Sequence, residues 1–558
     1  MARLDRLGPA KEVAQIGAAI GREFSHALLA SVVPKSEAEL GSALNRLINA
    51  GLVFRQGVPP HTTYLFKHAL VQDAAYGTLL REPRRTLHAR IVAALERQFP
   101  EVAESQPELL ARHCTEAGVI EKAAGLWGKA GQRSLARSAL IEATEQLNRA
   151  LAQIAALPGT TALRRDQIKL QVGLANALMH TKGYASSDTK ASLDQARLLI
   201  ERAEALGEAP EDPLLLYSVL YGFWVASYVA FNGDLVRELA EQFLTFAEKQ
   251  GGTVPLMIGH RVMGISLLNT GDFAQGRAHL DRAIALYEPV KHRPLAMRFG
   301  QDNRVAALSY RSWALWMLGY PEAALADTKH VLEDARAIGQ TATLMYSLYH
   351  TSFALIHCGN YAIASAQADE VIALADKKSS PFWKATGMMS RGGILALTGK
   401  ASDAVHMITS GVTSFRSTGS TVFTPFYLTY LARAHAELGK FDDAWRCIGE
   451  AMTAVQTTRE SWCEAEMHRI AGEIALMSPE PDAAKAEAYF KRALAIGRAQ
   501  HTMSLELRAA MSMARLWRDQ GNRQQAHDLL APVYGWFTEG FDTLDLKEAK
   551  ALVEQLKA

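Results

Sequence analysis

The stretch LGYPEAALADTKHV, residues 318–331, decides the fold because its pattern recurs along the chain. Three later segments repeat the same order of residue types: CGNYAIASAQADEV at 358–371, TGKASDAVHMITSG at 398–411 and LGKFDDAWRCIGEA at 438–451. Successive copies begin about 40 residues apart. Self-similarity at a fixed period of this length predicts a repeat protein.

A glycine and an alanine hold fixed places in the repeat. The glycine is the second residue of each copy, and the alanine stands five positions after the glycine. We expect the glycine to end one helix with positive φ, and the alanine to let the next helix approach its neighbour closely. These positions are Gly271, Gly319, Gly359, Gly399, Gly439 and Gly521, with Ala324, Ala364, Ala404, Ala444 and Ala526.

The order of turn glycine, aromatic residue and small residue resembles the tetratricopeptide repeat, although a step near 40 residues implies longer helices than that family usually has. HEAT-like repeats have this length but lack this order. The resemblance implies an all-α superhelix whose concave face binds a protein or peptide. We expect the array over residues 101–540, followed by a polar capping helix over 541–558.

Repeats in such a solenoid contact only their neighbours. Replacing Ala444 with leucine is therefore expected to loosen the chain from about residue 400 onward, while the N-terminal domain stays protected.

Two segments depart from the ordinary repeat. LLLYSVLYGFWVASYVAF (214–231) has no charge and is either a membrane span or a repeat helix that is buried all round; its tyrosines and serines favour the buried helix, so no membrane is expected. EPVKHRPLAMRFGQDNR (288–304) lengthens one step and is either a contact loop or a tolerated insertion.

Composition restricts the class of protein. The 558 residues are 49% hydrophobic and 21% charged, with a net charge of +2, which gives no general reason to expect nucleic acid as a partner. The four cysteines are scattered, and the opening MARLDRLGPAKEV carries charges where a signal peptide is apolar. These features favour the cytoplasm.

The first hundred residues have a different pattern. SEAELGSALNRLINAG (36–51) has apolar residues at helical spacing, and LVFRQG (52–57), a Pro-Pro turn and TTYLFKHAL (62–70) predict a hairpin. A helix that leads into a hairpin is typical of a winged-helix domain, which we place at 1–100.

Winged helices often bind DNA, and a basic cluster lies close to the wing: Arg81, Arg84, Arg85 and Arg90. The candidate recognition helix, however, offers few side chains that could read bases, with Asn45 and Arg46 set between leucines. A packing role is therefore preferred, and DNA contact is the alternative.

Three segments of this region, ARLDRLGPAKEVAQIGAAIGREF, FKHALVQDAAYGTLL and RRTLHARIVAALE, resemble the part that follows the nucleotide-binding domain in bacterial STAND-type ATPases. Those proteins are often fused to class III adenylate/guanylate cyclase domains and end in tetratricopeptide repeats. The resemblance implies that His68 contacts the β-phosphate of ADP bound to an ATPase domain, here one supplied in trans. Alternatively, His68 caps or packs the helix that follows it.

The motifs of catalysis are missing from the sequence. There is no G-x-x-x-x-G-K-[ST] phosphate loop, no H-E-x-x-H and no G-x-S-x-G, and no stretch carries the paired aspartates of a cyclase. The 17 histidines are dispersed. We therefore expect no enzyme activity, no metal and no cofactor.

These observations favour a scaffold or regulatory arm that binds a protein and relays the signal to an ATPase or cyclase module. The alternative is a transcription regulator that uses the winged helix on DNA and the repeats as sensor. A truncated enzyme is a third reading, which the missing phosphate loop disfavours.

Overall fold

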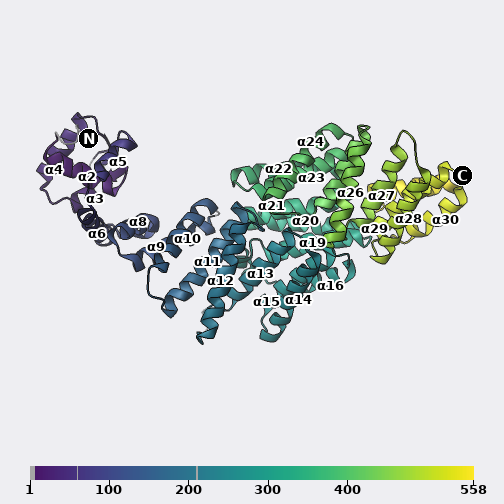
Figure 1. Ribbon diagram of the computed structural model, residues 1–558, viewed down its shortest axis with the longest axis horizontal. Helices are drawn as coiled ribbons and strands as arrows, with labels where there is room; N and C mark the ends of the chain where they lie inside the picture. The colour runs from purple at the N-terminus through teal and green to yellow at the C-terminus, as the bar shows by residue number, and fades with distance from the viewer. Residues whose placement is uncertain (1–6, 59–60, 138, 209–211, 558) are drawn as a thin grey trace. The chain divides into compact units, whose positions relative to one another are not determined.

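The computed structural model describes residues 7–58, 61–137, 139–208 and 212–557, which form two compact units divided between Leu170 and Gln171 (Figure 1). Helices dominate both units, so the predicted all-α class is confirmed apart from one small sheet in the first unit. The predicted Pro-Pro turn lies outside the described residues.

The first unit begins with helices around a three-stranded antiparallel sheet of order β1-β3-β2. The predicted hairpin is confirmed, since Val53 lies opposite Phe66 and Gln56 opposite Thr63. A further strand, β1, pairs with the other edge of β3 and was not predicted. The elements are α2 (Pro9–Ile20), β1 (Glu23–Ser25), α3 (His26–Val32), α4 (Glu37–Asn49), β2 (Val53–Gln56), β3 (Thr63–Phe66), α5 (Ala69–Gly77), α6 (Arg81–Gln98) and α7 (Pro100–Ser105).

Local sequence explains the third of the described helices that precede the hairpin. Ser36 and Glu39 form a capping box at the start of α4, which satisfies free N–H groups of its first turn. The leucines at helical spacing, Leu40, Leu44 and Leu47, are buried.

The rest of the first unit consists of α8 (Pro107–Ala117), α9 (Ile120–Ala136), α10 (Leu140–Ala155) and the first half of α11 (Thr161–Thr181). Buried histidines join α6 to α8, because His88 Nδ1 lies 2.8 Å from His113 Nδ1. Arg85 Nε also donates to the carbonyl oxygen of Ala117, at 3.0 Å. The early helix pairs thus form one compact unit with the N-terminal domain.

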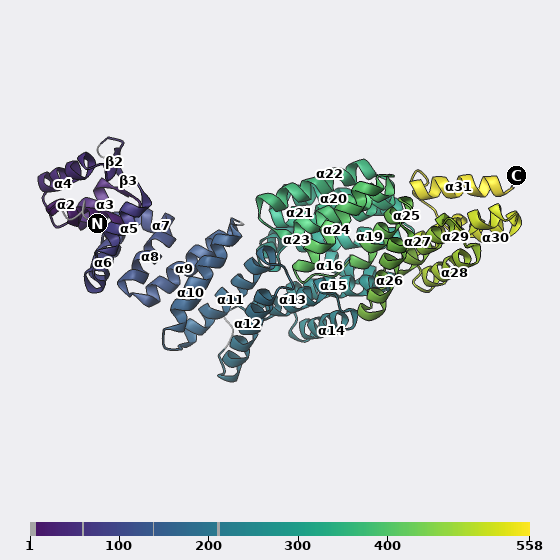
Figure 2. The ribbon, with the colours of Figure 1, turned by 45° about the horizontal axis from the view of Figure 1, so that its top comes forward.

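The second unit is a stack of helix pairs (Figure 2). The first helix of most pairs is buried on nearly every side and packs against the first helix of the next pair; we call these the inner helices. They are α11, α13 (Leu214–Val229), α15 (Thr253–Asn269), α19 (Asn303–Met317), α21 (Thr341–His357), α23 (Pro381–Leu397), α25 (Thr424–Glu437), α27 (Glu464–Met477) and α29 (Met503–Asp519), with α31 (Leu544–Lys557) at the end.

The second helix of each pair buries a single stripe, and these are the outer helices. They are α12 (Ser187–Ala205), α14 (Gly233–Gln250), α16 (Phe273–Ala285), α20 (Pro321–Ile338), α22 (Tyr361–Lys377), α24 (Ala401–Ser417), α26 (Phe441–Thr458), α28 (Ala483–Ala499) and α30 (Arg523–Gly535).

The turn glycines lie between an inner and an outer helix, and all six have φ between 72° and 91°, the left-handed region that favours glycine. The repeat alanines on the outer helices are completely buried. Both observations agree with the roles expected for these positions.

The uncharged segment 214–231 forms the buried helix α13, as preferred. No helix within the described ranges has both the length and the apolar character needed to cross a bilayer.

The insertion at 288–304 folds back onto the second unit through three short helical turns, α17 (Pro289–His292), η1 (Arg293–Leu295) and α18 (Ala296–Phe299). Arg298 forms an ion pair with Asp212, and Phe299 is fully buried with its ring 5.5 Å from that of Tyr221. The insertion is therefore a packed part of the second unit.

Distant repeats are joined by hydrogen bonds to the carbonyl groups that end the inner helices. The carbonyl oxygen of Val229 accepts from the N–H of Thr421, at 2.7 Å, and that of Asn269 accepts from the N–H of Ser461, at 3.1 Å. The carbonyl oxygen of Trp316 accepts from Ser504 Oγ at 2.5 Å. The expectation that repeats contact only their neighbours is therefore wrong, because the superhelix is wound tightly enough for its successive turns to touch.

This winding changes the outcome expected for Ala444→Leu. The larger side chain overpacks a fully buried position at a cost of about 1–3 kcal/mol. Since cross-turn bonds couple the repeats, we expect faster hydrogen exchange throughout residues 171–557, with the first unit unchanged.

Lys440→Leu, at an exposed position in the same repeat, is the control and is expected to change almost nothing. Faster exchange confined to the residues after about 400 would show that the cross-turn bonds do not couple the repeats.

Candidate functional site

A cavity of about 40 Å³ lies within the inner layer of the second unit. Inner helices α13, α15, α19, α21 and α23 contribute to its wall, together with the end of the insertion and the connection between α24 and α25. Most of the side chains around it are aromatic: Tyr184, Tyr221, Trp224, Tyr228, Tyr310, Tyr346, Tyr349, His350, Phe382, Trp383, Phe415 and Phe423.

Helical periodicity brings these rings together. Tyr221, Trp224 and Tyr228 recur at steps of three and four on α13, so they lie on one face, and their rings stack in sequence at 5.8 and 5.2 Å. Tyr346 and Tyr349 have the same spacing on α21. This aromatic face was not predicted, although the spacing of the rings within 214–231 indicates it; the segment was interpreted only as a buried helix or a membrane span.

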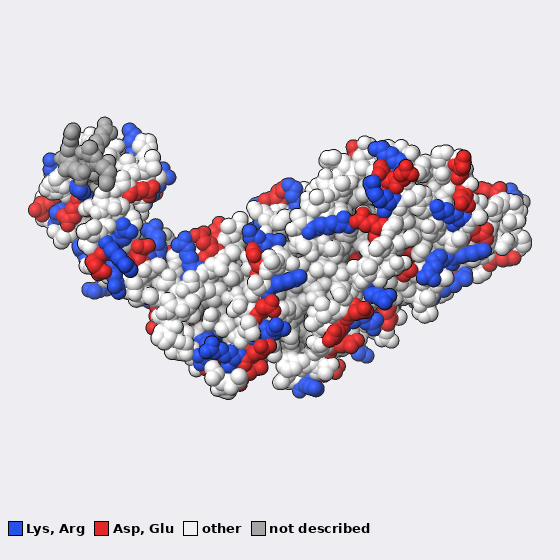
Figure 3. All heavy atoms as spheres, in the orientation of Figure 1, with Lys and Arg blue, Asp and Glu red and all other residues white. Residues whose placement is uncertain are grey.

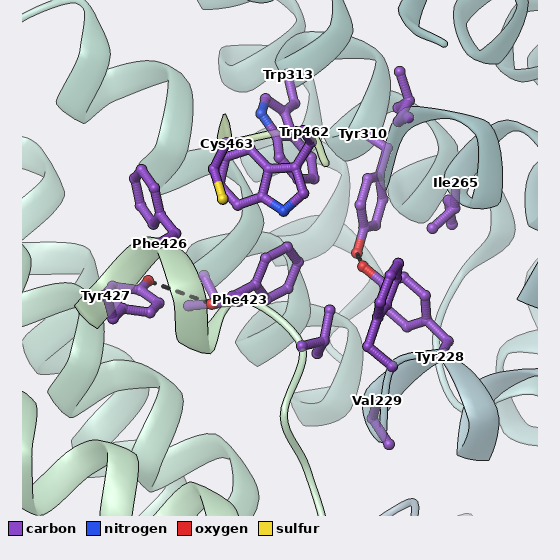
Figure 4. Close-up of a cluster of buried hydrophobic side chains, with 14 of the residues drawn as sticks. Tyr228, Val229, Ile265, Tyr310, Trp313, Phe423, Phe426, Tyr427, Trp462 and Cys463 are labelled. Atoms are coloured by element: carbon purple, nitrogen blue, oxygen red, sulfur yellow. Dashed lines mark hydrogen bonds between the residues drawn. The ribbon is translucent and has the colours of Figure 1, made fainter. Parts of the chain in front are cut away.

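Hydrogen bonds fix the polar ends of the rings. The hydroxyls of Tyr228 and Tyr310 lie 2.6 Å apart and point toward each other (Figure 4). Gln301, at the end of the insertion, donates from Nε2 to the Tyr221 hydroxyl at 2.8 Å. These tyrosines therefore bond to the protein and to one another.

Two side chains that line this cavity lack such partners: the indole N–H of Trp383 has none among the described residues, and Arg261 lacks them while carrying a charge. Its side chain comes from α15, is only 1% exposed, and has its guanidinium carbon 4.8 Å from the centre of the Tyr221 ring. None of its three guanidinium nitrogens has a hydrogen-bond partner among the described residues. An unpaired buried charge costs several kcal/mol of folding free energy. Without a partner, this arginine therefore destabilises the fold.

The connection between α24 and α25 closes one side of the cavity. Phe423 has φ of 64°, a left-handed conformation that is strained for a phenylalanine. Its N–H donates to Glu460 Oε1 at 2.7 Å, and the same oxygen accepts from Trp462 Nε1 at 2.9 Å. In Figure 4 the Phe423 ring lies between Tyr427 and the Tyr228–Tyr310 pair. Glu460 therefore holds an otherwise unfavourable backbone in place.

Burial controls protonation around the cavity. It raises the pKa of Glu460, which is 1% exposed, to about 8, and it lowers the pKa of His350 to about 4. Near neutral pH the imidazole is therefore uncharged and the carboxyl group is mostly protonated. Among the described side chains that line the cavity, Arg261 is therefore the one that carries a full charge.

The residues singled out from the sequence lie elsewhere, in the first unit. His68 is exposed at the start of α5, directly after β3, and its side chain makes no capping hydrogen bond to that helix. Arg81, Arg84, Arg85 and Arg90 all lie on α6.

Three of the four arginines donate to backbone carbonyl groups of the first unit. Arg84 Nη2 donates to Leu79 at 3.1 Å, Arg85 Nε donates to Ala117 at 3.0 Å, and Arg90 donates to Val32. Some of the N–H donors of this arginine cluster are therefore used in hydrogen bonds within the first unit. Across the described ranges, no group of three or more His, Cys, Asp or Glu side chains is placed to hold a metal ion.

Comparisons with known proteins agree with the repeat architecture. The family described as "Tetratricopeptide repeat" matches residues 258–282, which span most of α15 and α16. The chain is 24% identical over 519 residues to the uncharacterized protein R02095 of Rhizobium meliloti (strain 1021), a match that covers 92% of this chain and 49% of the relative. The chain thus spans about half the length of that curated relative.

Two solved structures are among those to which the chain is similar. A Rap protein complexed with Competence and Sporulation Factor is 12% identical with a TM-score of 0.48, over 68% of this chain and 98% of that one. A STAND protein with a tetratricopeptide repeat sensor from Pyrococcus horikoshii is 12% identical with a TM-score of 0.31, over 98% of this chain and 64% of that one. With the paired-helix geometry and the family match, the array is a tetratricopeptide-like helical solenoid.

The buried carboxyl group gives a pH prediction. Because the pKa of Glu460 rises from about 4.5 to about 8 on folding, its contribution to stability is full below pH 4.5 and is lost as the pH rises through 8. Glu460→Gln can keep both accepted hydrogen bonds and does not titrate. We expect the variant to gain at least about 2 °C in Tm relative to the wild type between pH 5 and pH 9.

Glu480→Gln, at an exposed position, controls for the loss of one acidic group and should follow the wild-type curve. Parallel wild-type and Glu460→Gln curves over this range would contradict the assignment.

Proposed function

We propose that this chain is a non-catalytic sensing and interaction arm, in which a tetratricopeptide-like array binds a ligand and relays its presence to a signalling module. The observation that carries the proposal is the cavity in the inner layer, because it combines an aromatic wall with one buried, unpaired arginine. A core that only stabilises the fold gains nothing from an unpaired buried charge.

Within this proposal, residues 1–100 form a winged-helix domain, 101–540 the array and 541–558 its cap. The order of elements from α2 to β3 and the β1-β3-β2 sheet support the winged-helix assignment. The partner is a protein or peptide, and the compartment is the cytoplasm. The cavity is lined by inner helices of the part of the array that the cross-turn hydrogen bonds join. In this proposal the ligand site is therefore internal, and the protein partner uses the concave face of other repeats.

The signalling module is an ATPase or cyclase domain supplied in trans or in a longer form of the protein. The resemblance of residues 1–100 to STAND-type ATPases supports this, and so does a relative about twice as long. His68 is free to reach a phosphate because it is exposed and does not cap α5. An adjoining reading frame that encodes a P-loop ATPase domain would identify the module.

The role of His68 can be tested by ADP retention once the ATPase module is combined with the chain. One charge-assisted hydrogen bond to phosphate corresponds to a loss of about tenfold in ADP affinity for His68→Ala. His61→Ala, another exposed histidine near the hairpin, is the matched control and should bind ADP like the wild type. Equal ADP affinity of all three proteins would remove His68 from the proposal.

DNA binding is the second candidate, and the structure gives it little support. Arg84, Arg85 and Arg90 use donors within the fold, and acidic side chains lie among the basic ones on the face of the first unit seen in Figure 3. We expect no tight binding to genomic fragments in a gel shift at physiological salt. Tight binding that is lost on Arg84→Glu plus Arg85→Glu would instead establish the transcription regulator.

A further inference from the structure

The unpaired guanidinium of Arg261 indicates what the cavity binds. Its nitrogens lack partners although the side chain is more than nine-tenths buried and lines the cavity. Arginine remains charged inside proteins, so burial cannot be relieved by loss of the proton. An anion from outside the chain would complete the site.

Acidic side chains in the segments next to the cavity wall have partners other than Arg261. Asp212 pairs with Arg298, and Asp302 accepts hydrogen bonds from the Tyr287 hydroxyl and from backbone N–H groups at the start of α19. Glu460 accepts from Phe423 and Trp462. Each of these acids therefore has a structural task of its own.

Charge and shape select a carboxylate. A single guanidinium balances one negative charge, whereas a doubly charged phosphate would leave a charge uncompensated among aromatic rings. The planar fork of arginine matches a carboxylate with two parallel hydrogen bonds. The 40 Å³ of the cavity admits such a small group.

The wall selects what is attached to the carboxylate. Aromatic rings surround Arg261, so the adjoining part of the ligand must be apolar or aromatic to exclude water and pack against them. Tyr184 and Phe423 stand on connections rather than on helices. Rotation of these two side chains, with the Phe423 backbone still held by Glu460, is the movement that a larger ligand body requires.

We propose that the cavity binds a carboxylate attached to an apolar or aromatic body, with Arg261 as its partner. The C-terminus of a short hydrophobic peptide and a free carboxylic acid share this chemistry. The inference rests on the sensing role proposed above and gives its ligand a chemical class.

Isothermal titration and thermal unfolding of the full chain test this. The probes are 3-phenylpropionate, 3-phenylpropionamide, and one short peptide ending in phenylalanine with either a free or an amidated C-terminus. We expect each carboxylate to bind at least about tenfold more tightly than its amide. Tighter binding of the free peptide than of phenylpropionate identifies a peptide terminus as the source, and the reverse identifies a free acid.

Variants assign the preference to Arg261. Arg261→Gln should abolish it and leave the ligand-free Tm unchanged or raised, because an unpaired buried charge has been removed. Arg261→Lys keeps the charge without the planar fork and should retain part of the preference. Arg282→Gln, an exposed arginine on α16, is the matched control and should bind like the wild type.

Several results would overturn the proposal: equal binding of acids and amides, no binding of either at millimolar concentration, an unchanged preference in Arg261→Gln, or equal stabilisation by sulfate alone. Such a failure is distinguishable from failure of the sensing role, because ADP retention through His68 is measured without this ligand.

Discussion

The second unit depends on hydrogen bonds that run from the end of one inner helix to the start of another inner helix a full superhelical turn later. The carbonyl groups that end a helix have no partner within it, and when buried they need one. Here later repeats supply the donors: Ser380 Oγ for His180, the N–H of Thr421 for Val229, and the N–H of Ser461 for Asn269. The partners advance in step, from α11 with α23 to α13 with α25 and α15 with α27, so the winding of the superhelix is fixed by backbone carbonyl groups and their donors in later repeats.

This winding determines what the interior can be made of. When successive turns touch, the inner layer becomes a core, and large flat rings fill it: Trp313 and Trp462, from α19 and from the segment before α27, meet edge to face at 4.5 Å. Aromatic side chains with one polar end suit such a place where the polar end finds a partner while the ring packs, as in the Tyr228–Tyr310 pair and in Trp462, whose indole N–H donates to Glu460. The cavity remains where Tyr228, Tyr310 and Phe423 fail to fill the space completely.

Local features of the fold could be predicted from the sequence, and long-range ones could not. The turn glycines and buried alanines follow from constraints within one helix pair, such as the left-handed φ of Gly319 and the close helix approach at Ala324. Strand β1 has only three residues, too few for a periodic signal. The approach of Thr421 to Val229 depends on the small rotation between successive repeats, which accumulates over many of them. No short sequence motif predicts this accumulated rotation. The site was missed for the same reason, since Arg261 and Phe423 line one cavity only because of the winding.

Two buried arginines of the inner layer show that the missing partner of Arg261 is specific to its site. Arg508, on α29, lies 4.9 Å from the Trp316 ring, much as Arg261 lies over Tyr221. Its Nε, however, donates to Asp545 Oδ2 at 2.7 Å, and its Nη1 lies 2.8 Å from His357 Nδ1. The fold thus gives one arginine an acid, an imidazole and a ring as partners, and gives the other a ring without any hydrogen-bond partner among the described residues. Because both environments belong to one continuous core, the difference lies in which side chains the helices present, and it leaves Arg261 as the place where the core is completed by something other than the chain itself.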